Sequence, residues 1–418
     1  MIITKEIFRT IILEGQELLQ EVAVYNRRYE LEENGKYVFV GVRQAGKSYM
    51  LFNKAKSLLN KGHSIEEIVY VNFDDERLVE LKADQLDLIL QAHQTVCDQK
   101  PILLFDEIQN VEHWEKFARR LVNMKYTVFI TGSNAKMLSS DIMSTLGGRF
   151  IDQMIFPYSF EEYIEVAGFS LSDNWQYGKE AAQIQRLLAD YIKWGGFPEL
   201  TLYKDKRQWL NSLYEKILLG DIVLRNKIKN VAALRLVMKK VAENVMRPVS
   251  GRRIANLISG TGVKTNTTSV IDYLQYAKEA FIIFPLTNYY SSFADRETTK
   301  KYYFIDNGLL SIFLADAETA LLENICAIKL YKKYADKVYY INDDVETDFY
   351  IPDEGYAVQA SYSIRDDNTR EREVKGLMKL HDKHPLKRME IVTYDEETVI
   401  DADGCQIAVV PLWKWLLM

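Results

Sequence analysis

The chain has 418 residues, of which 48% are hydrophobic and 27% charged, and its formal net charge is −6. This length exceeds one ordinary hydrophobic core, so we expect roughly two to three domains. An aromatic content of 12% argues against disorder. The acidic balance excludes a surface that is basic throughout, although a local basic patch for nucleic acid stays open.

The cysteines and the apolar runs indicate a compartment. Cys97, Cys326 and Cys405 lie far apart and form no CxxC pair, which fits a reducing environment and predicts neither a disulfide framework nor a zinc site. No apolar run approaches the roughly 20 residues that a membrane span needs. Residues 1–6 lack the features of a signal peptide. We therefore expect a cytoplasmic protein without a membrane partner.

Residues 1–34 predict an amphipathic lead-in, and residues 35–165 predict an α/β core. Short apolar runs in this core alternate with amphipathic stretches. The runs lie at residues 37–40, 68–73, 101–105, 126–131 and 153–156. This alternation predicts a parallel sheet with helices on both faces.

The most specific motif of the chain follows the first of these strands. Residues 41–48 have the GxxxxGK[ST] pattern of a phosphate loop, and a helix is predicted over 49–60. In such a loop, backbone N–H groups surround the phosphates, Lys47 reaches the β- and γ-phosphates, and the Ser48 hydroxyl holds Mg²⁺. The residues that we expect to bind the nucleotide are Gly41, Val42, Arg43, Gln44, Ala45, Gly46, Lys47, Ser48 and Tyr49.

Two acidic residues end the strand predicted at 102–105. Asp106 is expected in the Mg²⁺ shell beside Ser48, because a buried strand that ends in a carboxylate is where such a fold holds the metal. Glu107 is then placed to orient and deprotonate the attacking water. The two residues predict a hydrolytic site.

Polar residues after the neighbouring strand complete the expected site. Ser133 and Asn134 are candidate sensors of the γ-phosphate, although each taken singly also fits a polar turn. Arg149 follows two glycines and is either an arginine finger or a surface arginine. As a finger it would stabilise transition-state charge, in its own chain or in a second one.

The part of the chain after residue 165 divides into residues 166–288 and 289–418. The apolar residues have a helical period up to about residue 245. Residues 247–274 have the residue pattern of a helix-turn-helix, with a local positive patch. This region predicts either DNA contact or a unit that packs or binds protein. Residues 289–300 predict a loop, followed by a helix over 308–334 and β-rich segments. The basic residues of the patch are Arg247, Arg252, Arg253 and Lys264.

The last part of the chain carries an incomplete set of nuclease residues. Glu323, Asp348 and the pair Gln359 and Ser361 occur at helix, strand and strand, as a PD-(D/E)xK metal site requires. Phosphodiester cleavage there needs a second acid and a lysine where this chain has Gln359 and Ser361. We therefore expect a nuclease-like scaffold that does not cleave.

These motifs together resemble a known family. The loop at 41–48 is similar to the GPRQ-type loop of prokaryotic AAA-superfamily ATPases that carry a C-terminal domain of unknown function. The resemblance implies an ATPase core, a helical lid, a winged-helix-like segment and a C-terminal domain similar to restriction endonucleases. The motifs continue in the same order through residues 106–109, 131–133, 146–149, 156–160, 195–199, 220–222 and 301–309.

The sequence thus predicts an ATP-binding protein that hydrolyses ATP with Mg²⁺ and whose nucleotide state acts on DNA or on a protein partner. No NKxD motif for guanine occurs in a suitable place, which favours adenine. The alternatives are a nucleotide-gated DNA-binding module with negligible hydrolysis and, less favoured, a nuclease controlled by ATP. The oligomeric state is not readable from the sequence.

Overall fold

The computed structural model describes residues 3–32, 35–138, 140–315, 317–344 and 346–418 and separates two compact units, Met1–Phe156 and Pro157–Met418. Of the expected lead-in, residues 1–2 and 33–34 lie outside the described part. The first break falls before the expected boundary at 165. Helix α6 (Phe160–Val166) packs on α7 (Gly178–Trp194) and α16 (Leu412–Leu417), which makes it part of the second unit.

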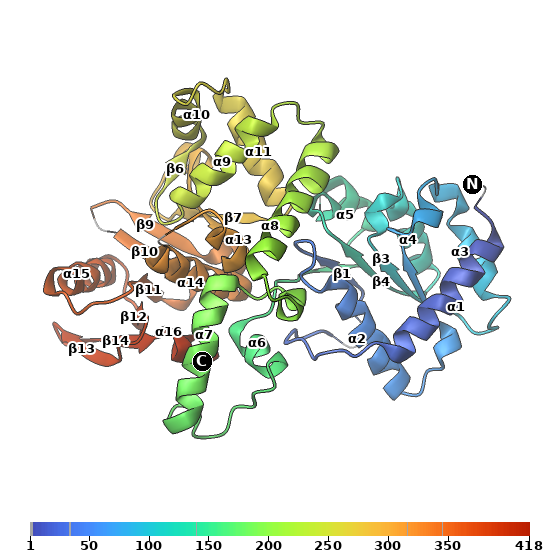
Figure 1. Cartoon of the computed structure of the whole chain (residues 1–418), viewed down its shortest axis with the longest axis horizontal. Helices are drawn as coiled ribbons and strands as arrows, with labels where there is room; N and C mark the ends of the chain where they lie inside the picture. The colour runs from blue at the N-terminus through green and yellow to red at the C-terminus, as the bar shows by residue number, and fades with distance from the viewer. Residues whose placement is uncertain (1–2, 33–34, 139, 316, 345) are drawn as a thin grey trace. The chain divides into compact units, whose positions relative to one another are not determined.

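The first unit is an α/β layer structure around a five-stranded parallel sheet with the order β2-β3-β4-β1-β5 (Figure 1). Its strands are β1 (Tyr37–Val40), β2 (Ile68–Asn72), β3 (Ile102–Asp106), β4 (Thr127–Gly132) and β5 (Ile151–Met154). Its α-helices are α1 (Lys5–Glu21), α2 (Lys47–Asn60), α3 (Asp87–His93), α4 (Trp114–Asn123) and α5 (Ser140–Leu146).

Burial explains why these segments form parallel strands. Every residue of β1 and β3 is buried, as expected of strands that helices cover on both sides. Helix α1 packs on β2 and α3, and α2 contacts β1, β3 and β4. The amphipathic lead-in is thus an integral helix of this layer structure. The predicted parallel sheet is confirmed.

The second unit contains a mixed nine-stranded sheet with the order β13-β14-β12-β11-β10-β9-β7-β8-β6. Its strands are β6 (Val249–Ser250), β7 (Ile283–Asn288), β8 (Thr299–Phe304), β9 (Tyr339–Asn342), β10 (Glu346–Ile351), β11 (Tyr356–Ala360), β12 (Arg388–Thr393), β13 (Thr398–Ala402) and β14 (Cys405–Pro411). The sheet crosses the expected division at 288/289, because β7 pairs with both β8 and β9.

Helices surround this sheet (Figure 1). Besides α6, α7 and α16 they are α8 (Lys206–Lys216), a π-helical segment (Ile217–Leu224), α9 (Val231–Glu243), α10 (Gly251–Ser259), α11 (Thr267–Glu279), α12 (Phe293–Thr298), α13 (Asn307–Ser311), α14 (Glu318–Tyr334) and α15 (Asp367–Lys383). The helical period predicted up to residue 245 is confirmed.

Two sequence predictions in the second unit are wrong in detail. The loop expected at 289–300 contains α12, whose N-cap Ser292 accepts a hydrogen bond from the backbone of Asp295. The single helix expected over 308–334 is two helices, α13 and α14. Polar composition at 289–300 concealed a short capped helix, and continuous apolar periodicity concealed the break before α14.

Candidate nucleotide-binding site

The phosphate loop connects β1 to α2. Gly41 opens it at a φ of 152°, where a Cβ atom would lie 2.2 Å from the carbonyl oxygen of Ile155, so no larger residue fits. Helix α2 begins at Lys47, and its first backbone N–H groups face the loop, as an anion site requires. Lys47 is only 4% exposed, and its Nζ donates to the carbonyl oxygen of Val42 at 3.1 Å.

The strand order brings distant residues to this loop. Strand β4 lies between β1 and β3, and the register pairs Val40 with Gly132 and Phe105 with Ile130. Because parallel strands end at the same edge, the end of β3 and the end of β4 meet beside the phosphate loop. The sheet therefore gathers Asp106 and the residues after Ile130 at one edge.

Asp106 is held by hydroxyl groups from three elements. It accepts hydrogen bonds from Ser48 of α2, from Tyr70 Oη of β2 at 2.8 Å, and from Thr131 Oγ1 of β4. Burial raises the pKa of Asp106, and the hydrogen bonds from Ser48 and Thr131 offset part of that rise. The hydroxyl groups fix the orientation of a carboxylate that is only 2% exposed.

Glu107, in contrast, has a positively charged neighbour, Lys47. Its backbone takes the left-handed conformation at a φ of 54°, which is uncommon for a residue with a side chain and typical of functional sites. One carboxylate oxygen lies 3.6 Å from Lys47 Nζ, and the other accepts from Ser133 Oγ at 2.9 Å and from Gln109 Nε2. Burial favours a higher pKa, but Lys47, Gln109 and Ser133 outweigh it and lower the pKa of Glu107.

The expected residues do not all converge on this edge. Ser133 contacts Glu107 directly, and Asn134 is buried at the same strand end, 5% exposed. Arg149 is exposed and donates to the carbonyl oxygens of Leu146 and Gly147 in its own turn, at 3.3 and 3.1 Å. The structure brings the two serines and both acids together, whereas the contacts of Arg149 lie within its turn.

The outer residues of the loop have different surroundings. Arg43 lies 3.8 Å from Asp74, which follows β2, and Gln44 adopts a φ of 63°. Tyr49 points outward with 43% of its surface exposed and packs edge-on against Phe52. Arg43 and Gln44 are therefore partly exposed members of the loop, and Tyr49 is exposed, whereas Lys47 is buried.

Three residues of the site were missed from the sequence. Thr131 joins the two acids, since its Oγ1 donates to Asp106 and accepts from the Glu107 N–H at 3.0 Å; its position at a strand end was a usable signal. Gln109 lies two residues beyond Glu107 and was visible in the same motif. Tyr70 lies inside a strand, and only the tertiary structure aims its hydroxyl group at Asp106.

The donor set fits a magnesium ion. Ser48 and Asp106 supply hydroxyl and carboxylate oxygens, which are the ligands that Mg²⁺ takes from P-loop proteins. The two side chains are hydrogen-bonded to each other, so both address one position next to the phosphate loop. These are the residues that would hold the ion.

The fold and this edge of the sheet define the class of the first unit. The profile of a family described as an AAA domain matches residues 33–164, which include the loop, both acids and Thr131. The first unit is therefore a P-loop ATPase domain of the AAA type, a nucleotide-binding class. A second profile, a domain of unknown function (DUF8612), matches residues 185–319.

Whole-chain relatives show the family. The chain is 31% identical over 435 residues to "Uncharacterized protein MJ1544" of Methanocaldococcus jannaschii, covering 100% of this chain and 96% of that protein. It is 31% identical over 392 residues to an uncharacterized protein of Haemophilus influenzae, covering 91% and 94%. The chain belongs to the family that includes these two proteins.

Among solved structures, the Walker-type ATPase PABY2304 of Pyrococcus abyssi is similar at 13% identity and a TM-score of 0.42. The match covers 71% of this chain and 99% of that one. Across the described residues, no helix combines the length and the apolar character needed to cross a membrane.

Proposed function

We propose that the protein binds ATP at residues 41–49 and hydrolyses its β/γ bond with Mg²⁺. One observation carries this proposal: the two neighbouring acids have different partners. Asp106 accepts hydrogen bonds from Ser48 and Thr131, whereas Glu107 lies beside the Lys47 ammonium. This arrangement supports a division into a metal carboxylate and a water-activating carboxylate.

The roles follow from the contacts. Lys47 neutralises phosphate charge, and α2 directs its first N–H groups at the same anion. Mg²⁺, when bound through Ser48 and Asp106, supplies charge stabilisation at the phosphates. Glu107 has a lowered pKa and is therefore ionised at neutral pH, which is the form that accepts a proton from water. Ser133 and Gln109 orient its carboxylate.

Two variants test the assignment. Lys47→Ala should abolish ATP binding, whereas Glu107→Gln should bind ATP and lose roughly 10²–10⁴-fold in turnover. Calorimetry with ATP and Mg²⁺ and a phosphate-release assay give the two readouts. Glu112→Gln, which changes an exposed carboxylate close by, is the matched control. Wild-type turnover in Glu107→Gln would show that another group activates the water.

The remaining expectations about this core are proposals of the same kind. The loop sequence at 41–48 supports membership of the GPRQ-type group. Asn134, at the end of β4, is a second sensor candidate beside Ser133. Arg149 is proposed as a finger that reaches a triphosphate only after its turn rearranges, in its own chain or in a second copy. An Arg149→Ala variant whose turnover stays unchanged at every protein concentration would exclude both forms.

A second candidate function, DNA binding, has its own observation. Helix α9, strand β6, helices α10 and α11, strand β7, helix α12 and strand β8 follow one another, and β8 pairs with both β6 and β7. That order supports a winged helix in which α11 would be the recognition helix. Asn266 caps α11 by accepting from the Ser269 N–H at 2.8 Å.

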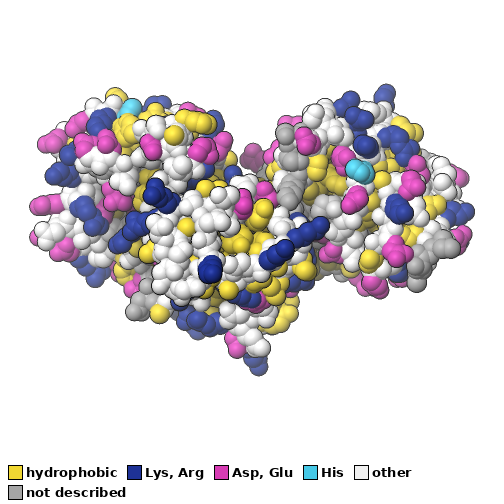
Figure 2. Space-filling view, turned by 90° about the horizontal axis from the view of Figure 1, so that it is seen from above, with side chains coloured by type: hydrophobic (Ala, Val, Ile, Leu, Met, Phe, Trp, Pro, Cys, Tyr) yellow, Lys and Arg dark blue, Asp and Glu magenta, His cyan; other side chains and the backbone are white. Residues whose placement is uncertain are grey.

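The distribution of basic side chains around α10 and α11 bears on this second function. Figure 2 shows basic and acidic side chains interspersed over the visible face, so a DNA site needs a concentrated patch. A groove of about 500 Å³ lies beside α11. Its walls include Arg252, Lys278 and Lys300, together with Thr267, Gln275 and one acid, Glu297, which pairs with Lys300 at 3.2 Å. Cations and hydroxyl or amide groups around a groove suit a phosphate backbone.

Electrophoretic mobility shift with duplex DNA at two salt concentrations tests this function. We expect binding at low salt that weakens steeply at higher salt, because counterion release drives it. Charge reversal in the groove, Arg252→Glu with Lys278→Glu, should remove the shift, and Lys204→Glu on an exposed loop should not. Absence of a shift even at low salt would leave a protein partner as the target of the nucleotide state.

A further inference from the structure

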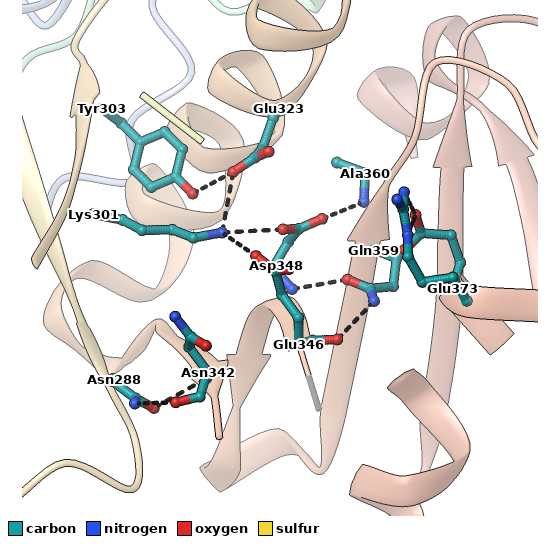
Figure 3. A network of polar contacts seen from close by, with 11 residues as sticks. Asn288, Lys301, Tyr303, Glu323, Asn342, Glu346, Asp348, Gln359, Ala360 and Glu373 are labelled. Atoms are coloured by element: carbon teal, nitrogen blue, oxygen red, sulfur yellow. Dashed lines mark hydrogen bonds and ion pairs between the residues drawn. The ribbon is translucent and has the colours of Figure 1, made fainter. Parts of the chain in front are cut away.

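A lysine lies at the centre of the carboxylates that the nuclease pattern contains. Lys301 of β8 is fully buried. Its Nζ lies 3.1 Å from Asp348 Oδ1, 3.4 Å from Glu323 Oε1 and 3.8 Å from Glu346 Oε1 (Figure 3). Three elements distant in sequence, β8, α14 and β10, therefore contribute to one ionic cluster.

The two inner carboxylates are held firmly toward the ammonium. Tyr303 Oη donates to Glu323 Oε1 at 2.7 Å, and the Ala360 N–H donates to Asp348 Oδ2 at 3.1 Å. Each carboxylate thus accepts a hydrogen bond from a second donor besides Lys301, as Figure 3 shows. Glu346, in contrast, has a side chain that is 62% exposed and borders the cluster from the solvent side.

With Lys301 in place, the described side chains around this cluster offer no ligand set for a divalent metal. Gln359 is engaged with the backbone of β10, since its Oε1 accepts from the Asp348 N–H at 2.8 Å and its Nε2 donates to the Glu346 carbonyl oxygen at 3.0 Å. The nearby Glu373 is paired with Arg372 at 2.6 Å. Within the described part of the chain, no three acidic, histidine or cysteine side chains are grouped as metal ligands.

The charges in the cluster favour a permanent cation. Burial alone lowers the pKa of Lys301, but Glu323, Asp348 and Glu346 outweigh it, so the pKa is raised above its usual value. A lysine in this state keeps its charge and is no nucleophile. For Glu323, burial and the neighbouring Asp348 raise the pKa to about 7, and Lys301 opposes that rise. Without Lys301, the buried Glu323 and the partly buried Asp348 would face each other without a countercharge, which is unfavourable.

We propose that the Lys301 ammonium is the resident cation of this centre and occupies the place that a divalent metal takes in nucleases with a comparable set of carboxylates. The Lys301 side chain then excludes a metal ion from this position, and metal-dependent cleavage cannot occur there. The same ion pairs connect β8, which precedes α13, to β10 and α14. The cluster is then a structural junction and not a reaction centre.

The test is thermal unfolding of the full chain with and without millimolar Mn²⁺. Lys301→Met keeps the apolar stem and removes the charge, and we expect its Tm to fall by roughly 5–15 °C. Mn²⁺ should recover part of that loss in Lys301→Met but not in Lys301→Met with Asp348→Asn. Lys375→Met, on an exposed lysine of α15, is the matched control and should change Tm little.

Wild-type protein supplies a test that does not depend on a destabilised variant. Mn²⁺ binding measured by calorimetry should be the same in wild type and Asp348→Asn, because the phosphate-loop site is common to both. Binding that Asp348→Asn removes would overturn the proposal, as would an undiminished Tm in Lys301→Met or a loss that Mn²⁺ does not reduce.

Should Lys301→Met not fold, a charge-neutral variant decides. Lys301→Met combined with Glu323→Gln and Asp348→Asn removes the cation and both of its inner partners, so it should fold with a Tm close to that of wild type. A triple variant that remains unfolded would refute the proposal.

Discussion

A buried arginine upstream of the phosphate loop leads to a sharp prediction about ATP affinity. Arg27 is 6% exposed, and its guanidinium donates to the carbonyl oxygen of Ala45 at 3.1 Å and to that of Phe156 at 2.7 Å. Tyr29 Oη accepts from the Phe156 N–H at 2.9 Å. The segment before β1 thereby ties the phosphate loop to the chain that follows β5.

The structure allows the effect of Arg27→Ala to be worked out. The variant removes two hydrogen bonds from a charged donor, each worth about 1.5–3 kcal/mol, and leaves two buried carbonyl oxygens without that donor. If about half of the loss of roughly 3–6 kcal/mol appears as disorder of the loop, ordering it on binding costs about 1.5–3 kcal/mol. That cost corresponds to a roughly 10–100-fold weaker Kd for ATP.

Calorimetric titration of ATP with Mg²⁺ into Arg27→Ala measures this shift, and urea unfolding measures the accompanying loss of stability. Arg28→Ala is the matched control, because Arg28 is the exposed neighbour. Arg27→Lys should be intermediate, since one ammonium does not reproduce the fork of a guanidinium. A wild-type Kd in a folded Arg27→Ala variant would refute the idea that this contact preorganises the loop.

Three further predictions concern other contacts. Thr131→Val removes the hydroxyl group that bridges the two acids, and Mg²⁺-dependent ATP affinity should fall about tenfold; an unchanged Mg²⁺ titration would contradict this role. Gln109→Ala should lower kcat by about tenfold with an unchanged ATP Kd, and equal losses in both would indicate a folding defect. Burial lowers the pKa of Lys329 to about 8, below the usual 10.4 or so. The unfolded chain therefore binds more protons between these values, stability rises with pH there, and charged Lys329 costs about 3 kcal/mol at pH 7. Lys329→Met removes this cost but also loses the hydrogen bond to the Trp415 carbonyl oxygen. The net result at pH 7 should be a second unit that is more stable by about 1–2 kcal/mol in urea unfolding. The gain should shrink above pH 8, and an equal gain at all pH values would contradict the cause.

Local sequence was sufficient where a function depends on consecutive residues. The phosphate-loop motif could be identified because its glycines, lysine and serine have fixed spacings within residues 41–48, and β3 ends in Asp106, where a buried apolar run stops. The alternation of strands and helices likewise predicted the parallel sheet of the first unit. Such features need only short-range spacing and hydrophobic periodicity, which one sequence displays.

Contacts between strands that are not consecutive required the tertiary structure. The insertion of β4 between β1 and β3 brings Thr131 to Asp106, and the position of β2 brings Tyr70 to the same carboxylate. The sequence contained no periodicity that reports strand order, because a parallel sheet can place buried strands in several orders with the same apolar pattern. The same holds for the second unit. Glu323 and Asp348 could be recognised in the sequence as part of a nuclease pattern, but the pairing of β8 with β7 and of β7 with β9 is what places Lys301 between them. Sequence motifs thus identified the acidic residues of both centres, whereas only the packing of the sheets determined which side chains contact them.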